Sequence, residues 1–218
     1  MNFLQITREL ARMAGMSGGG PTNTEGQSGE PRRAVDFVRI AYEEICNLHF
    51  DWDFLWATDT IDVTDDFDLY PAPGDLHIWD VKRVFLDGEP LPVIEWADYR
   101  PGLYAESGRP ECLVIRPDNN VLLCPHPNDD YTLSFDYFKR AEPLVKSNDV
   151  PLIPAPYRRV ILGRALLLYG NYEAAEDAMK QGLELYQEYL QKLEMYQLTR
   201  RQQTHGRQES IDITVTAQ

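Results

Sequence analysis

The spacing of apolar residues changes twice along this chain of 218 residues. Near the N-terminus, apolar side chains recur every three or four positions, as on one face of a helix. Between residues 54 and 140 they alternate with polar ones, and from residue 156 the helical spacing returns. A segment with a period of two cannot continue a helix with a period of 3.6. The sequence therefore predicts an α+β fold in which a β unit is inserted into a helical chain.

Two helices are predicted before the insertion. The first covers residues 2–14, and Gly15 ends it because glycine readily adopts the left-handed backbone of a helix C-terminus. A glycine-rich loop follows. The second helix has Ser28 or Gly29 as its cap and ends near His49.

The alternating segment is expected to form an antiparallel β unit of about six strands. Asp87-Gly88 is typical of a tight hairpin turn, and residues 118–120 (Asp-Asn-Asn) suit another. The last strand runs through residues 131–137. We place the β insertion at residues 51–150.

The C-terminal part is expected to hold two more helices. The first covers residues 156–169, Gly170-Asn171 breaks it, and a long helix runs from residue 173 to about 198. We expect residues 1–50 and 151–198 to form a four-helix bundle. Residues 199–218 form an extended C-terminal tail, in which Ile211, Ile213 and Val215 alternate like a strand.

The net charge is −14, and it is unevenly distributed. Between Arg39 and Lys82 there is no Lys or Arg, although eleven Asp or Glu residues lie there. Such a surface repels a nucleic-acid backbone. The tail differs, because Arg200, Arg201 and Arg207 lie close together.

No motif in the sequence requires a cofactor, a metal or an enzymatic reaction. The glycines from Gly18 to Gly20 lack the Gly-Lys-Ser/Thr of a phosphate-binding loop, and the histidines lack metal-site spacing. Glu43 and Glu44 could pair with other carboxylates as glycosidase acids, although helix-surface glutamates are the simpler interpretation. No apolar run is long enough for a membrane span. Three widely spaced cysteines are consistent with a reducing compartment.

Two blocks of the chain resemble a known family. The first reads S-G-x-G-P, then G-Q-x-G-E, an arginine and W-x-F-L, here Ser17, Gly18, Gly20, Pro21, Gly26, Gln27, Gly29, Glu30, Arg33, Trp52, Phe54 and Leu55. The second comprises residues 107–110, 131–138 and 150–175. Together they resemble tailed-bacteriophage head-to-tail adaptors, also called connector, neck or tail tubular protein A-like proteins.

The resemblance implies a structural virion protein of the neck, assembled in the host cytoplasm. Such proteins form a ring, usually dodecameric, beneath the portal, and they dock the tail nozzle or tube. The ring extends the channel through which double-stranded DNA passes without specific binding. No enzymatic activity, cofactor or membrane contact is implied. A tail-completion (tail-terminator) protein and a cell-wall hydrolase are the alternative functions.

Three sets of residues are the candidate functional sites under this resemblance. We expect the tail to bind the portal through Ile211, Ile213, Val215, Arg200, Arg201 and Arg207. Acidic residues are expected to face the channel: Asp59, Asp62, Asp65, Asp66 and Asp68. The glycine-rich loop is expected to touch a neighbouring subunit through Gly18, Gly20, Pro21 and Gln27.

Overall fold

The computed structural model describes residues 1–16, 20–100 and 106–198. The chain forms two compact units, one from residues 1–54 with the segment after residue 140, the other from residues 55–140. Residues 51–54 and 141–150, expected in the β insertion, thus group with the helices. Gly18 and the candidate portal-binding residues of the tail lie outside the described residues.

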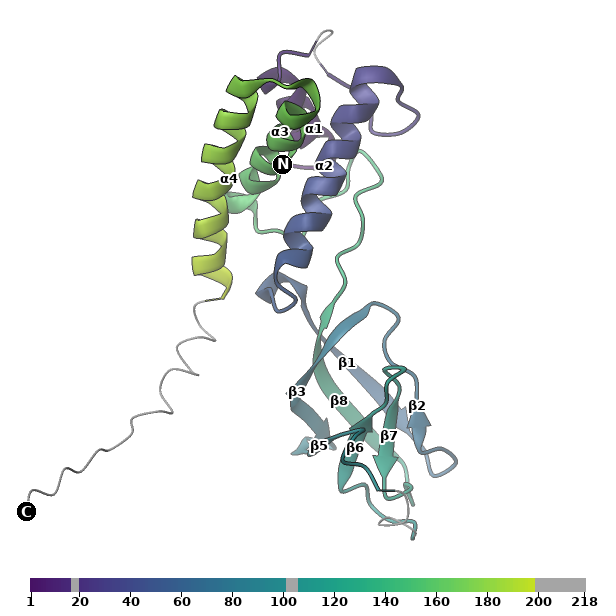
Figure 1. The fold of residues 1–218 in the computed structure, drawn as a ribbon. Helices are drawn as coiled ribbons and strands as arrows, with labels where there is room; N and C mark the ends of the chain where they lie inside the picture. The colour runs from purple at the N-terminus through teal and green to yellow at the C-terminus, as the bar shows by residue number, and fades with distance from the viewer. Residues whose placement is uncertain (17–19, 101–105, 199–218) are drawn as a thin grey trace, which may run out of the picture. The chain divides into compact units, whose positions relative to one another are not determined.

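The helical unit contains α1 (Phe3–Met13), α2 (Gly29–Leu48), α3 (Arg159–Glu173) and α4 (Glu176–Gln197). Helix α3 packs against α1, α2 and α4 (Figure 1). As predicted, Gly15 follows α1 in the left-handed region with φ +65°, and α2 begins after Ser28 and ends at His49.

The predicted break at Gly170-Asn171 is wrong. Helix α3 continues through both residues to Glu173, and Ala174 after it adopts the left-handed conformation with φ 53°. Gly170 lies at a contact between α3 and α4 and not in a turn. A Cβ placed on it would lie 2.6 Å from Cγ and 2.8 Å from the backbone nitrogen of Met179 on α4.

Two further glycines let α3 and α4 approach backbone to backbone. A Cβ on Gly163 would lie 2.5 Å from the backbone nitrogen of Tyr186, and one on Gly182 would lie 2.8 Å from that of Leu167. A Cβ atom in a protein does not come this close to an atom to which it is not bonded. The pairing of α3 with α4 therefore depends on glycine at these positions.

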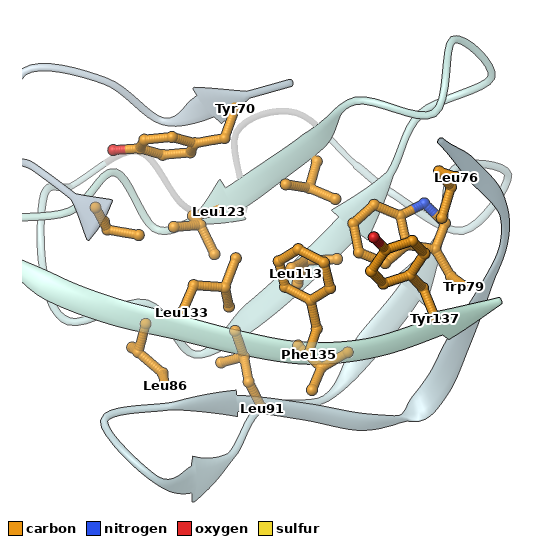
Figure 2. Packing of buried hydrophobic residues seen from close by; sticks show 13 residues of the cluster. Tyr70, Leu76, Trp79, Leu86, Leu91, Leu113, Leu123, Leu133, Phe135 and Tyr137 are labelled. Carbon is orange, nitrogen blue, oxygen red and sulfur yellow. The ribbon is translucent and has the colours of Figure 1, made fainter. Parts of the chain in front are cut away.

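The β unit consists of two four-stranded sheets. The first has the order β1 (Trp56–Val63), β8 (Tyr131–Lys139), β3 (Leu76–Leu86), β4 (Glu89–Pro90). The second has the order β2 (Leu69–Tyr70), β7 (Val121–Cys124), β6 (Cys112–Ile115), β5 (Val93–Glu95). Buried side chains from both sheets form one core, which includes Trp79, Leu113, Leu123, Leu133 and Phe135 (Figure 2).

Both predicted hairpin turns are present. Asp87 and Gly88 have φ values of 51° and 82°, which is the pattern of a type I′ turn between β3 and β4. Asn119, with φ 66°, lies in the turn between β6 and β7. Among the described strands, β5 and β6 pair in parallel, in contrast to the expected antiparallel arrangement throughout.

We expect Gly163→Ala to destabilise the helical unit by about 1–3 kcal/mol, because the new methyl group has no space between α3 and α4. Gly74→Ala is the matched control, since nothing lies within 4 Å of a Cβ at that position. Denaturant unfolding followed by circular dichroism at 222 nm measures both variants. Equal midpoints for Gly163→Ala and the wild type would contradict the close approach of the two helices.

Candidate assembly surfaces

The described part of the glycine-rich loop lies on α1 of its own chain. Arg8 donates from Nε to the carbonyl oxygen of Pro21 at 3.0 Å and from a terminal nitrogen to that of Thr22 at 3.1 Å. Gly20 has φ +86°, and a Cβ there would lie 2.9 Å from Cβ of Ala11. The loop therefore has a defined path, and its glycine is required by close packing.

The described loop candidates are only partly accessible. Gly20 and Gln27 are half-buried, and Pro21 is buried. The Gln27 amide donates to the side chain of Asn23. Contact between this loop and a neighbouring subunit remains a prediction.

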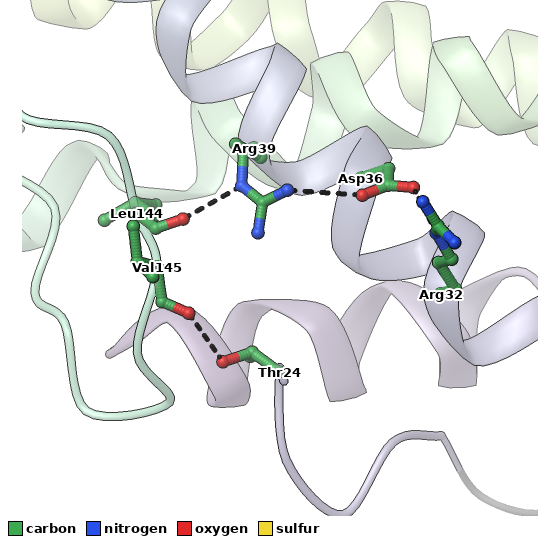
Figure 3. Close-up of polar contacts among 6 residues, drawn as sticks. All are labelled: Thr24, Arg32, Asp36, Arg39, Leu144 and Val145. Carbon is green, nitrogen blue, oxygen red and sulfur yellow. Dashed lines mark hydrogen bonds and ion pairs between the residues drawn. The ribbon is translucent and has the colours of Figure 1, made fainter. Parts of the chain in front are cut away.

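Residues 144–149, here called the strap, connect the returning chain to the N-terminal half of the helical unit. The strap accepts a hydrogen bond from Arg39 Nε at the carbonyl oxygen of Leu144, at 3.0 Å. Thr24 donates its hydroxyl to the carbonyl oxygen of Val145 at 3.1 Å and its backbone N–H to Ser147 Oγ at 3.0 Å. Figure 3 shows Thr24 and Arg39 reaching the strap from the loop and from α2.

The same strap caps the start of α1. Backbone N–H groups of Phe3 and Leu4 donate to the carbonyl oxygens of Asp149 and Ser147, at 2.8 and 3.2 Å. One carboxylate oxygen of Asp149 accepts the backbone N–H groups of Val145 and Lys146, each at 2.7 Å. These two hydrogen bonds lower the pKa of the Asp149 carboxyl group. The strap thus has its own internal cap, and its shape depends on a charged carboxylate.

The aromatic run after α2 belongs to the helical unit. Trp52 is fully buried, and its indole N–H donates to the carbonyl oxygen of Ile45 at 3.0 Å. Phe54 stacks on Trp52 with 5.4 Å between ring centroids, and its backbone N–H donates to Gln197 at 2.9 Å. Trp56 begins β1 and is 46% exposed. Trp56 thus groups with the β unit, whereas Trp52 and Phe54 group with the helical unit.

Glu44 is held in an ion pair on the helical unit. Arg164 of α3 donates to both of its carboxylate oxygens, at 2.6 and 3.2 Å, and the contact raises the pKa of the guanidinium. A glycosidase acid must be free to exchange a proton with its substrate. The contact assigns Glu44 a structural role between α2 and α3.

The five acidic candidates do not share one surface. On β1, Ala57 and Ile61 pack toward the core between the sheets. Asp59 lies between them on the same face, whereas Asp62 lies on the opposite face of the strand. Asp65 and Asp66 are exposed in the turn that follows, and Asp68 is half-buried near its end.

Tyr70 orders that acidic turn, a role that the sequence analysis missed. Its hydroxyl donates to the carbonyl oxygen of Phe67 at 2.8 Å and accepts the backbone N–H of Thr64 at 3.0 Å. The tyrosine ring itself is buried in the core of the β unit. The backbone of the turn therefore has a defined path.

Asp136 on the central strand β8 was also missed. It is 6% exposed, and its carboxylate accepts Thr58 Oγ1 of β1 at 2.9 Å and Arg83 Nε of β3 at 3.0 Å. An acidic residue between the aromatic residues Phe135 and Tyr137 is the signal that could have indicated it. Beside it, the register of β3 shifts between Trp79 and Val84, which marks a bulge.

Neither a metal centre nor a membrane span is found among the described residues. Within residues 1–16, 20–100 and 106–198, no three His, Cys, Asp or Glu side chains form a group that could hold a metal ion. Over the same ranges, no helix has the length and apolar character needed to cross a membrane.

The family model described as SU10 adaptor protein matches residues 1–210. The chain belongs to this family of phage head-to-tail adaptors. The adaptor is therefore a structural protein of a bacteriophage virion. No curated protein matches the chain.

Membership in the family also bears on enzymatic activity and on location. A structural adaptor implies a role other than catalysis, and it implies a place in the neck of the virion. It further suggests an oligomer that assembles with portal and tail proteins.

We expect Asp149→Ala to loosen the strap and to lower stability by about 1 kcal/mol, the usual value for a side-chain cap. The pKa of Asp149 is lowered in the folded state, so its stabilising effect is present above the ordinary pKa of an aspartate and is lost as pH falls through the lowered value. The difference between the variant and the wild type should therefore shrink as the pH falls below the ordinary range of an aspartate. Thermal unfolding measured between pH 2.5 and 7 tests this, and a pH-independent difference would contradict it.

Proposed function

We propose that this adaptor forms a closed ring of twelve subunits beneath the portal. The helical unit forms the body of the ring and the β unit faces the tail nozzle or tube. The observation that carries the proposal is the family match over residues 1–210. The fixed loop and the strap support it, since a ring needs subunit surfaces that are shaped before assembly.

We propose that the acidic turn at residues 64–68 lines or rims the DNA channel. The backbone of this turn is held through Tyr70, and no Lys or Arg occurs between Arg39 and Lys82. Negative groups give the phosphate backbone no site at which to bind, so double-stranded DNA slides past them. Asp59, which accepts a hydrogen bond from the neighbouring Thr60 backbone, contributes less to this surface.

We further propose that the C-terminal tail binds the portal. Ile211, Ile213 and Val215 alternate beyond a basic linker that contains Arg200, Arg201 and Arg207. An extended segment of this kind can add to the edge of a partner's sheet, where backbone hydrogen bonds give affinity and alternate side chains give specificity. Within the ring, the loop with Gly20 and Gln27 would contact the next subunit.

Electron microscopy of the adaptor mixed with its portal tests the ring. We expect a closed ring stacked on the portal with an open axial channel, and the map gives the number of subunits. Residues 64–68 should face the axis, and their placement on the outer wall would remove the channel proposal. Adaptor left free beside bare portals would instead favour the tail-completion role.

We expect deletion of residues 200–218 to abolish portal binding, because the tail supplies the segment that orders on the partner. The helical and β units should keep their circular dichroism spectrum and unfolding midpoint, since both are complete without the tail. Co-sedimentation with portal rings measures the binding. Unchanged binding by the truncated chain would show that another surface docks the portal.

A further inference from the structure

Among the described residues, β1 is the longest of the strands that stand at the end of a sheet. Sheet orders place four strands at edges, and three of them are short: β2 and β4 have two residues each and β5 has three. Strand β1 has eight and pairs only with β8. Natural sheets keep their open edges short or protected, because an unpaired edge recruits another strand. A long edge therefore needs an explanation.

The outer side of β1 carries backbone groups that are not used by the sheet. In an antiparallel pair, alternate residues turn their N–H and C=O groups away from the partner strand. The N–H of Thr60 donates to its neighbour Asp59 Oδ1 at 2.8 Å, which marks Thr58, Thr60 and Asp62 as the outward set. Thr58, Asp59 and Thr60 are exposed in succession, as expected where no further strand covers the edge.

The chain itself contains a segment that matches this edge. Residues 210–217 (SIDITVTA) have the same length as β1 and alternate between apolar and polar side chains. On β1 (WATDTIDV), Ala57, Ile61 and Val63 face the core with Asp59 between them, and Thr58 and Thr60 lie on the other face. Paired with β1, the segment would extend the core with isoleucine and valine and would place threonines beside threonines, a favourable cross-strand pair.

Charge selects the direction of pairing. The acidic turn with Asp65, Asp66 and Asp68 follows the C-terminal end of β1. The basic residues Arg200, Arg201 and Arg207 precede the N-terminal end of the matching segment. Antiparallel pairing brings these two groups together, whereas parallel pairing would separate them. Opposite charges at close range stabilise the complex and favour this orientation.

We propose that, in the free adaptor, residues 210–217 of one copy pair antiparallel with the β1 edge of a second copy. Each copy carries one donor segment and one acceptor edge, so the contact is heterologous and can repeat around a ring. Portal binding would draw the same segment away, because one strand cannot pair with both partners. Only this release step rests on the proposed portal-binding role of the tail.

The full-length variants Thr60→Cys and Thr214→Cys test the pairing without any portal present. Thr60 is exposed on β1, whereas Cys46, Cys112 and Cys124 are buried. A short bis-maleimide should link the two variants into a covalent dimer when they are mixed. The wild type and each variant alone should give at most a low background. No dimer above that background would overturn the proposal.

The double variant Thr60→Cys/Thr214→Cys distinguishes a second copy from the chain's own tail. A cross-link within single chains that persists on dilution would show that the tail folds back on its own β unit, and it would overturn the pairing between copies. A dimer yield that rises with concentration supports the pairing. Adding portal should then reduce the yield, and failure of this last step alone would contradict the portal role.

Matched charge substitutions in the tail test the alternation. In the Thr214→Cys chain, Ile213→Asp places a charge on the apolar face, and Thr216→Asp places the same charge on the polar face. We expect Ile213→Asp to reduce the dimer at least about tenfold, because a buried branched side chain is replaced by a charge. Thr216→Asp should have a small effect. Equal losses would show that only net charge matters and would contradict strand pairing.

Discussion

The contact between the strap and the N-terminal half of the helical unit is the interaction on which the architecture depends. The two halves of this unit are separated in sequence by the whole β unit. Hydrogen bonds from Thr24 and Arg39 to residues 144–147 bring the returning chain back to the loop and α2. Because α1 also begins on the strap, three N-terminal elements are positioned by one returning segment. Helix α3 can then pack against α1 and α2, and α4 can pack against α3.

Periodicity predicted the classes of element well, and it failed where tertiary contacts decide. Helices α1 and α2 and the two turns at Asp87 and Asn119 follow from local spacing and from residues that tolerate positive φ. The glycine at Gly170 was misread, because the sequence does not reveal that Met179 will lie against it. Local reasoning sees a flexible residue, whereas the fold uses the missing side chain for space.

The same limit applies to the candidate sites. Composition identified the acidic segment, but it could not show that Asp59 and Asp62 lie on opposite faces of one strand. It also could not show that Tyr70, from the far end of the turn, holds residues 64–67 by its hydroxyl. Both facts depend on strand phase and on long-range packing of the β unit. Residues 199–218, which carry the candidate portal contacts, lie outside the described part of the chain.

The protection of β1 is incomplete in a way that suits reversible assembly. Asp59 lies on the face of the strand that is turned toward the core, and its carboxylate accepts the backbone N–H of Thr60. A charge placed on the inner face of an edge discourages unwanted strands. Its effect is local, however, since a strand that supplies its own carbonyl oxygen can replace the carboxylate at Thr60. A full-length complementary strand gains a ladder of such bonds, whereas a chance contact gains one. The edge therefore discriminates by length and pattern, and that selectivity is what an assembly protein requires.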